Sequence, residues 1–188
     1  VTSSIPILAK TGEQEFGLGV KLSGLKLSDT LWGLFDPENL MPKDPGSIEF
    51  AIDGATILEE GLTSGAIMEN HNLDPLGFGQ ILKFRLKDFF LDALGLKIEA
   101  SGSFEFDNGD FETFEGIPRP IGNGSVKLEG SDAFIDRLEK MQLFPSETIM
   151  GARMMLALIM RVVDDDVLMS EFEIDQKGKI YANGQRLR

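Results

Sequence analysis

Hydrophobic and polar residues alternate along most of the chain, a pattern typical of β-strands with two different faces. From Phe16 onward, apolar residues occupy the even positions, and glycine, lysine and serine occupy the odd ones. The same parity returns in later segments, which include Ile48, Phe50 and Ile52, then Leu82, Phe84 and Leu86, then Ile98, Phe104 and Phe106, and finally Phe172 and Ile174. This alternation predicts an antiparallel sheet with one apolar face and one face in water.

Two short helices are predicted inside two similar stretches of sequence, residues 15–60 and 122–188. In the first, Ser28 or Asp29 can cap a helix, and an apolar segment then ends at Pro42. In the second, Ser131 or Asp132 takes the same place, and Pro145 follows at the same spacing. The match favours an internal duplication, although any junction of strand, cap, helix and proline has a similar pattern. Gly95, Gly178 and the pair Asn108 and Gly109 mark the expected turns between strands.

A third helix is predicted from Ser146 to about Met160. It is apolar around much of its circumference, through Ile149, Met150, Met154, Met155, Leu158 and Ile159. Such a helix is normally buried between layers. The expected architecture is therefore a single α+β domain over residues 1–188. We expect a curved, mainly antiparallel sheet of about six to eight strands, with two or three helices on its apolar face.

Composition narrows the classes of function. The chain has 188 residues, no Cys, one His and a formal net charge of −13. Cysteine-based redox or metal chemistry is thus excluded, and so large an acidic excess disfavours nucleic acid as a partner. The longest apolar stretch, residues 154–160, is too short to span a membrane. We predict no cofactor and no metal site.

Several segments resemble the bacterial domain-of-unknown-function family 2125. They are residues 31–45 (LWGLFDPENLMPKDP), residues 102–108 (GSFEFDN), residues 150–156 (MGARMML) and residues 182–188 (ANGQRLR). The resemblance implies an alphaproteobacterial, periplasmic envelope protein that carries an export signal in its complete form, with this chain as the C-terminal part. More loosely, the repeated units resemble the β-rich repeats of AsmA-type envelope proteins, some of which carry lipids. The resemblance supplies no catalytic residues.

Isolated polar residues offer few candidates for chemistry. His71 lies in a polar loop and is expected to be solvated. The cluster Asp107, Asn108, Gly109 and Asp110, followed by Glu112 and Glu115, carries oxygen ligands suited to calcium, but a turn without metal is favoured. The run 164–166 of three aspartates is expected to be a solvated loop. Arg153, inside the apolar helix, is expected either to extend its charged end to the surface or to pair with a carboxylate such as Asp136 or Glu139; the alternative is that it binds an anionic head group.

The abundance of Phe and Met suggests a function. The candidate ligand site is an apolar cleft between sheet and helix, lined by Phe84, Phe104, Phe106, Met150, Arg153 and Met154. Phe90 is expected on the same apolar face. The leading hypothesis is a non-enzymatic module that binds an apolar ligand such as a lipid. The alternative is a structural or protein-interaction module that uses a sheet edge or an apolar patch.

Overall fold

The protein folds around one antiparallel sheet. The structure is a computed structural model that describes residues 2–4, 12–58 and 79–188. In these ranges the elements are β1 (Thr2–Ser4), β2 (Gln14–Leu25), α1 (Asp29–Phe35), β3 (Gly46–Leu58), β4 (Gly79–Ala93), β5 (Leu96–Asp107), β6 (Arg119–Glu129), α3 (Ser131–Lys140), α4 (Ser146–Ile159), β7 (Arg161–Asp164), β8 (Val167–Ile174), β9 (Ile180–Ala182) and β10 (Gln185–Arg186).

The strand order largely follows the chain. It reads β1-β2-β3-β4-β5-β6-β8-β9-β10. β7 and β9 both pair with the same edge of β8, β7 with its first half and β9 with its second half. The α+β class and the antiparallel sheet are confirmed. The strand count of six to eight is wrong, because ten strands form. The segment after α4 accounts for much of the difference, since it forms four strands, β7 to β10.

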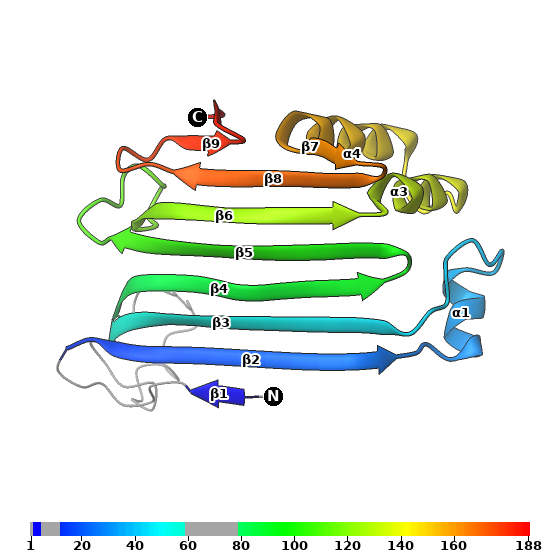
Figure 1. The fold of residues 1–188 in the computed structure, drawn as a ribbon, viewed down its shortest axis with the longest axis horizontal. Helices are drawn as coiled ribbons and strands as arrows, with labels where there is room; N and C mark the ends of the chain where they lie inside the picture. Colours follow the sequence, from blue (N-terminus) through cyan, green and yellow to red (C-terminus); the bar gives the residue numbers. More distant parts are fainter. Residues whose placement is uncertain (1, 5–11, 59–78) are drawn as a thin grey trace.

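The helices lie at one end of the sheet and leave most of the apolar face uncovered (Figure 1). Among the described helices, α4 meets a corner of that face at its C-terminal end, where the buried Ser170 hydroxyl donates to the Ile159 carbonyl at 2.6 Å. The prediction that helices pack on the apolar face is therefore wrong for the centre of the sheet. None of the helices in the described ranges is long and apolar enough to cross a membrane.

Helix starts show what local sequence can and cannot specify. Ser28 caps α1 as predicted, accepting from the Leu31 amide at 3.4 Å. The predicted caps of α3 are wrong: Gly130 takes the cap position with φ +78°. The side-chain oxygens come instead from Asp166, which accepts from the amides of Asp132 at 2.8 Å and Ala133 at 3.2 Å. At α4 the cap is Pro145, without a side-chain hydrogen bond.

A small core lies beside α1. Trp32 and Met41 are buried, and Asp36, only 1% exposed, lies with them. The Asp36 carboxylate accepts from the backbone amides of Leu40 at 2.9 Å and Met41 at 2.8 Å. Trp32 and Ile135, which occupy equivalent places in the two similar units, are both buried on their helices. The duplication itself stays a prediction.

The predicted turns at Gly95 and Gly178 are confirmed. Leu94 and Gly95 join β4 to β5, and Gly95 has φ +77°, which glycine adopts without steric cost. Gly178, at φ +73°, lies in the turn between β8 and β9, where a Cβ would come within 2.5 Å of the Thr113 side chain. The hairpin turn predicted at Asn108 and Gly109 is wrong: these residues lie in a turn after β5, but residues 108–118 separate β5 from β6 and neither residue has a positive φ. The Asn108 amide donates to the Ile81 carbonyl at 2.8 Å.

Candidate functional site

One face of the sheet carries four rows of mostly apolar residues across six strands, β2 to β6 and β8. Directly paired residues share a face, so the register defines the rows. They are Phe16, Gly54, Phe84, Phe104, Gly122 and Ile174; Leu18, Ile52, Leu86, Gly102, Gly124 and Phe172; Val20, Phe50, Phe89, Ala100, Val126 and Ser170; and Leu22, Ile48, Leu91, Ile98, Leu128 and Leu168. We call this surface the apolar face.

The apolar face is half open to water. Of its residues only Ser170 is buried, and it lies at the corner that α4 reaches. Six strands and four rows span about 24 Å by 20 Å at ordinary strand and residue spacings. Contiguous apolar patches of several hundred Å² usually mark a site of interaction. The apolar face is therefore the main candidate for ligand or partner binding.

The predicted cleft residues divide into two groups at opposite ends of the sheet. Phe84 and Phe104 are paired on the apolar face, and Phe106 follows on the same side, paired with Pro120. Met150, Arg153 and Met154 lie on α4, at the other end (Figure 1). The structure therefore does not bring the two groups together into one cleft. The Phe104 ring instead lies against the backbone of its own sheet, within 3.0 Å of where a Cβ on Gly122 would stand.

The outer side of α4 is exposed, which contradicts its predicted burial between layers. Ile149 is buried, but Met150 is 63% exposed and Met154 is 67% exposed. Met155 and Leu158 are exposed as well. The helix is apolar on both sides, as its sequence shows, but in the described ranges only its inner side finds a partner.

Arg153 forms the predicted ion pair. Its guanidinium donates to Asp136 at 2.5 Å and to Glu139 at 3.4 Å, both on α3. The hydrogen bond from Arg153 lowers the pKa of the Asp136 carboxyl below its ordinary value. Arg153 therefore links α4 to α3. Pairing with carboxylates of the protein itself accounts for its contacts, without an anionic head group.

Phe90, expected on the apolar face, lies on the opposite one. The pairing of β4 with β5 shifts between Leu86 and Phe89, so the parity of the strand changes there. Phe89 takes the apolar position opposite Phe50, whereas Phe90 pairs with Glu49 and Glu99. A β-bulge adds one residue to one strand, so odd and even positions beyond it point to opposite faces from those before it. Counting alternate positions along the sequence does not reveal where a bulge lies.

An apolar pocket lies beside α1, where the row of Leu22 and Ile48 reaches the end of the sheet. Its volume is about 490 Å³. Its lining is mostly apolar, with charged residues also present: Leu25, Lys26, Leu27, Trp32, Lys43, Asp44, Gly46, Ser47, Ile48, Leu91, Ala93 and Leu94. Ile48 and Leu91 belong to the pocket and to the apolar face alike, so the two surfaces are continuous. Sequence reasoning misses this pocket, although Trp32, the only tryptophan, is a signal for it.

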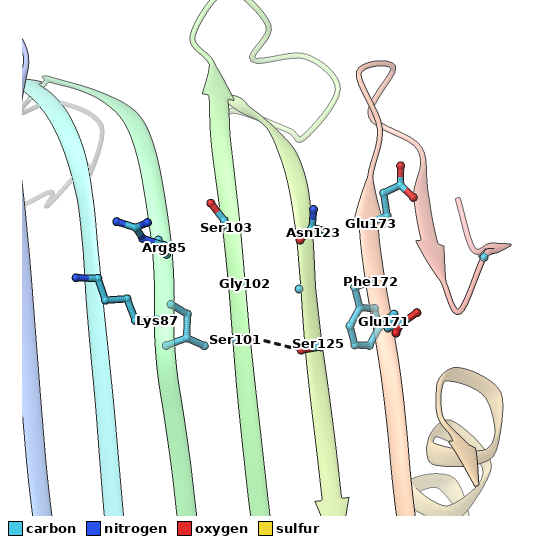
Figure 2. Close-up of a pocket in the computed structure, with 13 residues that line it drawn as sticks. Arg85, Lys87, Ser101, Gly102, Ser103, Asn123, Ser125, Glu171, Phe172 and Glu173 are labelled. Carbon is cyan, nitrogen blue, oxygen red and sulfur yellow. Dashed lines mark hydrogen bonds between the residues drawn. The ribbon is translucent and has the colours of Figure 1, made fainter. Parts of the chain in front are cut away.

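The opposite face is polar and contains a shallow trough of about 720 Å³. Figure 2 shows its residues: Arg85 and Lys87 lie on one side, and Glu171 and Glu173 on the other. Ser101, Ser103, Asn123 and Ser125 lie between them, and the hydroxyls of Ser101 and Ser125 are 3.2 Å apart. Residues of one row of the apolar face also line the trough: Leu86, Gly102, Gly124 and Phe172.

The cations of the trough are already paired within the sheet. Arg85 donates to Asp53 on β3 at 2.7 Å and 3.0 Å, and Lys87 forms a second ion pair with the same carboxylate. The hydrogen bonds from Arg85 and Lys87 lower the pKa of Asp53 from its ordinary value of 3.8 to about 2. These contacts stabilise the pairing of β3 with β4, and Glu171 and Glu173 on the other side of the trough offset the positive charge that remains.

The acidic turn after β5 is organised by an arginine. Arg119 donates to Asp107 at 2.5 Å and to Asp110 at 2.8 Å. Hydrogen bonds from the amide and hydroxyl of Thr113 lower the pKa of Asp110. Within the described ranges, no group of three or more acidic or histidine side chains could hold a metal ion. His71 lies outside the described residues.

Comparison of the chain with models of known protein families, with curated proteins and with solved structures finds no match. The fold and the candidate surfaces are therefore argued from strand register, burial and contacts alone. The resemblance to family 2125 stays a prediction.

Proposed function

We propose that the chain is a non-enzymatic binding module that takes up the acyl part of an amphiphile on the apolar face. The observation that carries the proposal is the open state of this face: of its 24 positions across four rows, only Ser170 is buried. Covering such a surface stabilises a complex by about 25 cal/mol for each Å² of apolar area removed from water. An acyl chain can cover the apolar face because it needs no polar partner along its length. The envelope location implied by the resemblance to family 2125 belongs to this proposal.

Two neighbouring phenylalanines provide a matched test. Phe89 lies on the apolar face and Phe90 on the polar face of the same strand. The probe is the methyl ester of cis-parinaric acid, an uncharged acyl chain that fluoresces in apolar surroundings. Wild type and Phe90→Gln are expected to bind it alike. Phe89→Gln is expected to weaken binding by about fivefold or more, because it removes apolar contact area.

Phe89→Leu keeps the position apolar and is expected to restore most of the binding, which separates loss of contact from loss of fold. Circular dichroism checks that each variant keeps the wild-type sheet. An ester that does not bind to wild type, or that binds equally well to Phe89→Gln, would refute the proposal.

A second candidate function is the addition of a partner's strand to the sheet, and one edge favours it. β1 pairs only with Gly17–Gly19 of β2. Among the described residues no strand pairs with the outer side of β2 from Lys21 to Leu25, where Leu22 and Leu25 are 46% and 50% exposed. An extended peptide can pair with such an edge. Replacing Ser23 by proline removes one backbone N–H from this stretch of β2. The change is expected to weaken association with a partner while leaving binding of the ester unchanged.

A further inference from the structure

We propose that the pocket beside α1 selects a monoanionic, single-chain amphiphile, a long-chain fatty acid. Its carboxylate is bound at Lys26 and Lys43, and its chain runs onto the apolar face. This inference rests on the proposed function and names the ligand class for it.

The lysines of the pocket differ from those of the sheet. Each lysine on the described strands pairs with a carboxylate; these five are Lys21, Lys83, Lys87, Lys97 and Lys127. Lys26 and Lys43 have no carboxylate within ion-pair distance anywhere in the described ranges, and both are exposed. Lys140, Lys177 and Lys179, which also lie outside the strands, form no ion pair in the described ranges either, so Lys26 and Lys43 differ from them by lying beside an apolar pocket.

Lys43 is held at the pocket by its surroundings. Its ammonium lies 5.4 Å from the centre of the Trp32 ring and donates to the Asn39 side chain at 2.5 Å. An ammonium has three donors, so it can bind an anion while it keeps this contact. Asp44 also lines the pocket, so two lysines and one aspartate leave a net charge of +1. This charge matches a head group with one negative charge.

The size and continuity of the pocket favour a single chain. A volume of about 490 Å³ is within the range of pockets that bind small ligands. Ile48 and Leu91, which the pocket shares with the apolar face, provide an apolar exit from the head-group position. A fatty acid fits both the charged and the apolar part of the pocket: its carboxylate lies near the two ammonium groups, and its methylenes lie on apolar side chains.

Trp32 makes the position of the chain measurable, because it is the only tryptophan and lines the pocket. Bromine atoms on an acyl chain quench tryptophan fluorescence on contact. The probes are 9,10-dibromostearic acid and its methyl ester, titrated into the full chain. The acid is expected to quench Trp32 at a concentration roughly three- to tenfold lower than the ester needs. Added salt should reduce the difference, because it screens exposed charges.

Lysine variants test head-group recognition. The double variant Lys26→Gln with Lys43→Gln is expected to lose the preference for the acid and to bind the acid as weakly as the ester. Lys21→Gln serves as the control, because Lys21 is paired with Glu49 on the sheet. It is expected to behave as wild type. The inference is overturned if acid and ester quench equally in wild type, or if the double variant keeps its preference for the acid.

The two proposals fail in different ways. Parinaric ester that binds and responds to Phe89→Gln, without quenching of Trp32 by the dibromo acid, overturns the fatty-acid pocket and leaves the proposed function intact. Failure of every acyl probe to bind overturns both.

Discussion

The buried carboxylate of Asp36 is expected to hold the chain beside α1 in place. Its two oxygens accept from the amides of Leu40 and Met41, at 2.9 Å and 2.8 Å. Asp36→Ala removes both acceptors. Leaving the buried Met41 amide without an acceptor costs about 1–3 kcal/mol, because this amide is in the core and cannot reach water, whereas the half-buried Leu40 amide costs about 0.5–1 kcal/mol. The expected loss in the free energy of unfolding is therefore about 1.5–4 kcal/mol.

Urea unfolding followed by Trp32 fluorescence measures this loss locally, because Trp32 is buried in the same core. Asp36→Asn keeps one oxygen as an acceptor and is expected to lose about half as much. Glu38→Ala, at an exposed neighbouring position, is the control and is expected to change stability by less than about 0.5 kcal/mol. A loss below about 0.5 kcal/mol in Asp36→Ala would show that the two hydrogen bonds do not stabilise the fold.

Three further predictions concern other parts of the fold. Asp166→Ala removes the oxygens that cap α3 and is expected to destabilise the protein by about 1 kcal/mol in thermal unfolding; an unchanged midpoint would contradict that role. Gly54→Ala places a Cβ 2.2 Å from a backbone oxygen and is expected to cost about 1–3 kcal/mol. Gly151→Ala, on α4 with open space around it, is expected to stabilise by up to about 1 kcal/mol, so equal effects of the two substitutions would contradict the steric role of Gly54. Asp53, whose pKa is lowered from 3.8 to about 2, contributes stability that is present at neutral pH and is lost as the pH falls from about 4 to about 2. Asp53→Asn should remove this part of the acid dependence, which urea unfolding at pH 5 and pH 2.5 measures.

Short-range patterns in the sequence account for most of the correct predictions. Alternation from Phe16 to Leu22 assigns the side chains of β2 to the correct faces of the sheet, because successive side chains of a strand point to opposite faces. Ser28 is identifiable as a cap because its partner is three residues away. The turn at Gly95 follows from its backbone freedom.

The errors arise where distant parts of the chain decide. Asp166 caps a helix that begins 35 residues earlier, so no local signal reveals it. Phe90 faces the polar side because a bulge shifts the pairing of two strands. Met150 and Met154 are apolar without being buried, since burial depends on what covers α4 and not on its composition. For the same reason the predicted site combines residues from opposite ends of the sheet.

The strand order has a consequence for how the chain acquires its structure. From β1 to β6 each strand pairs with the strand next to it along the chain. The turn of β4 into β5 takes only Leu94 and Gly95, so this hairpin closes at little entropic cost and can serve as a nucleus. Strands then add outward, and each gains partners only from its neighbours, as in a quasi-one-dimensional array. Protection of backbone amides against hydrogen exchange should accordingly be greatest in β4 and β5 and decline toward β1 and β10, where opening needs the loss of a single pairing.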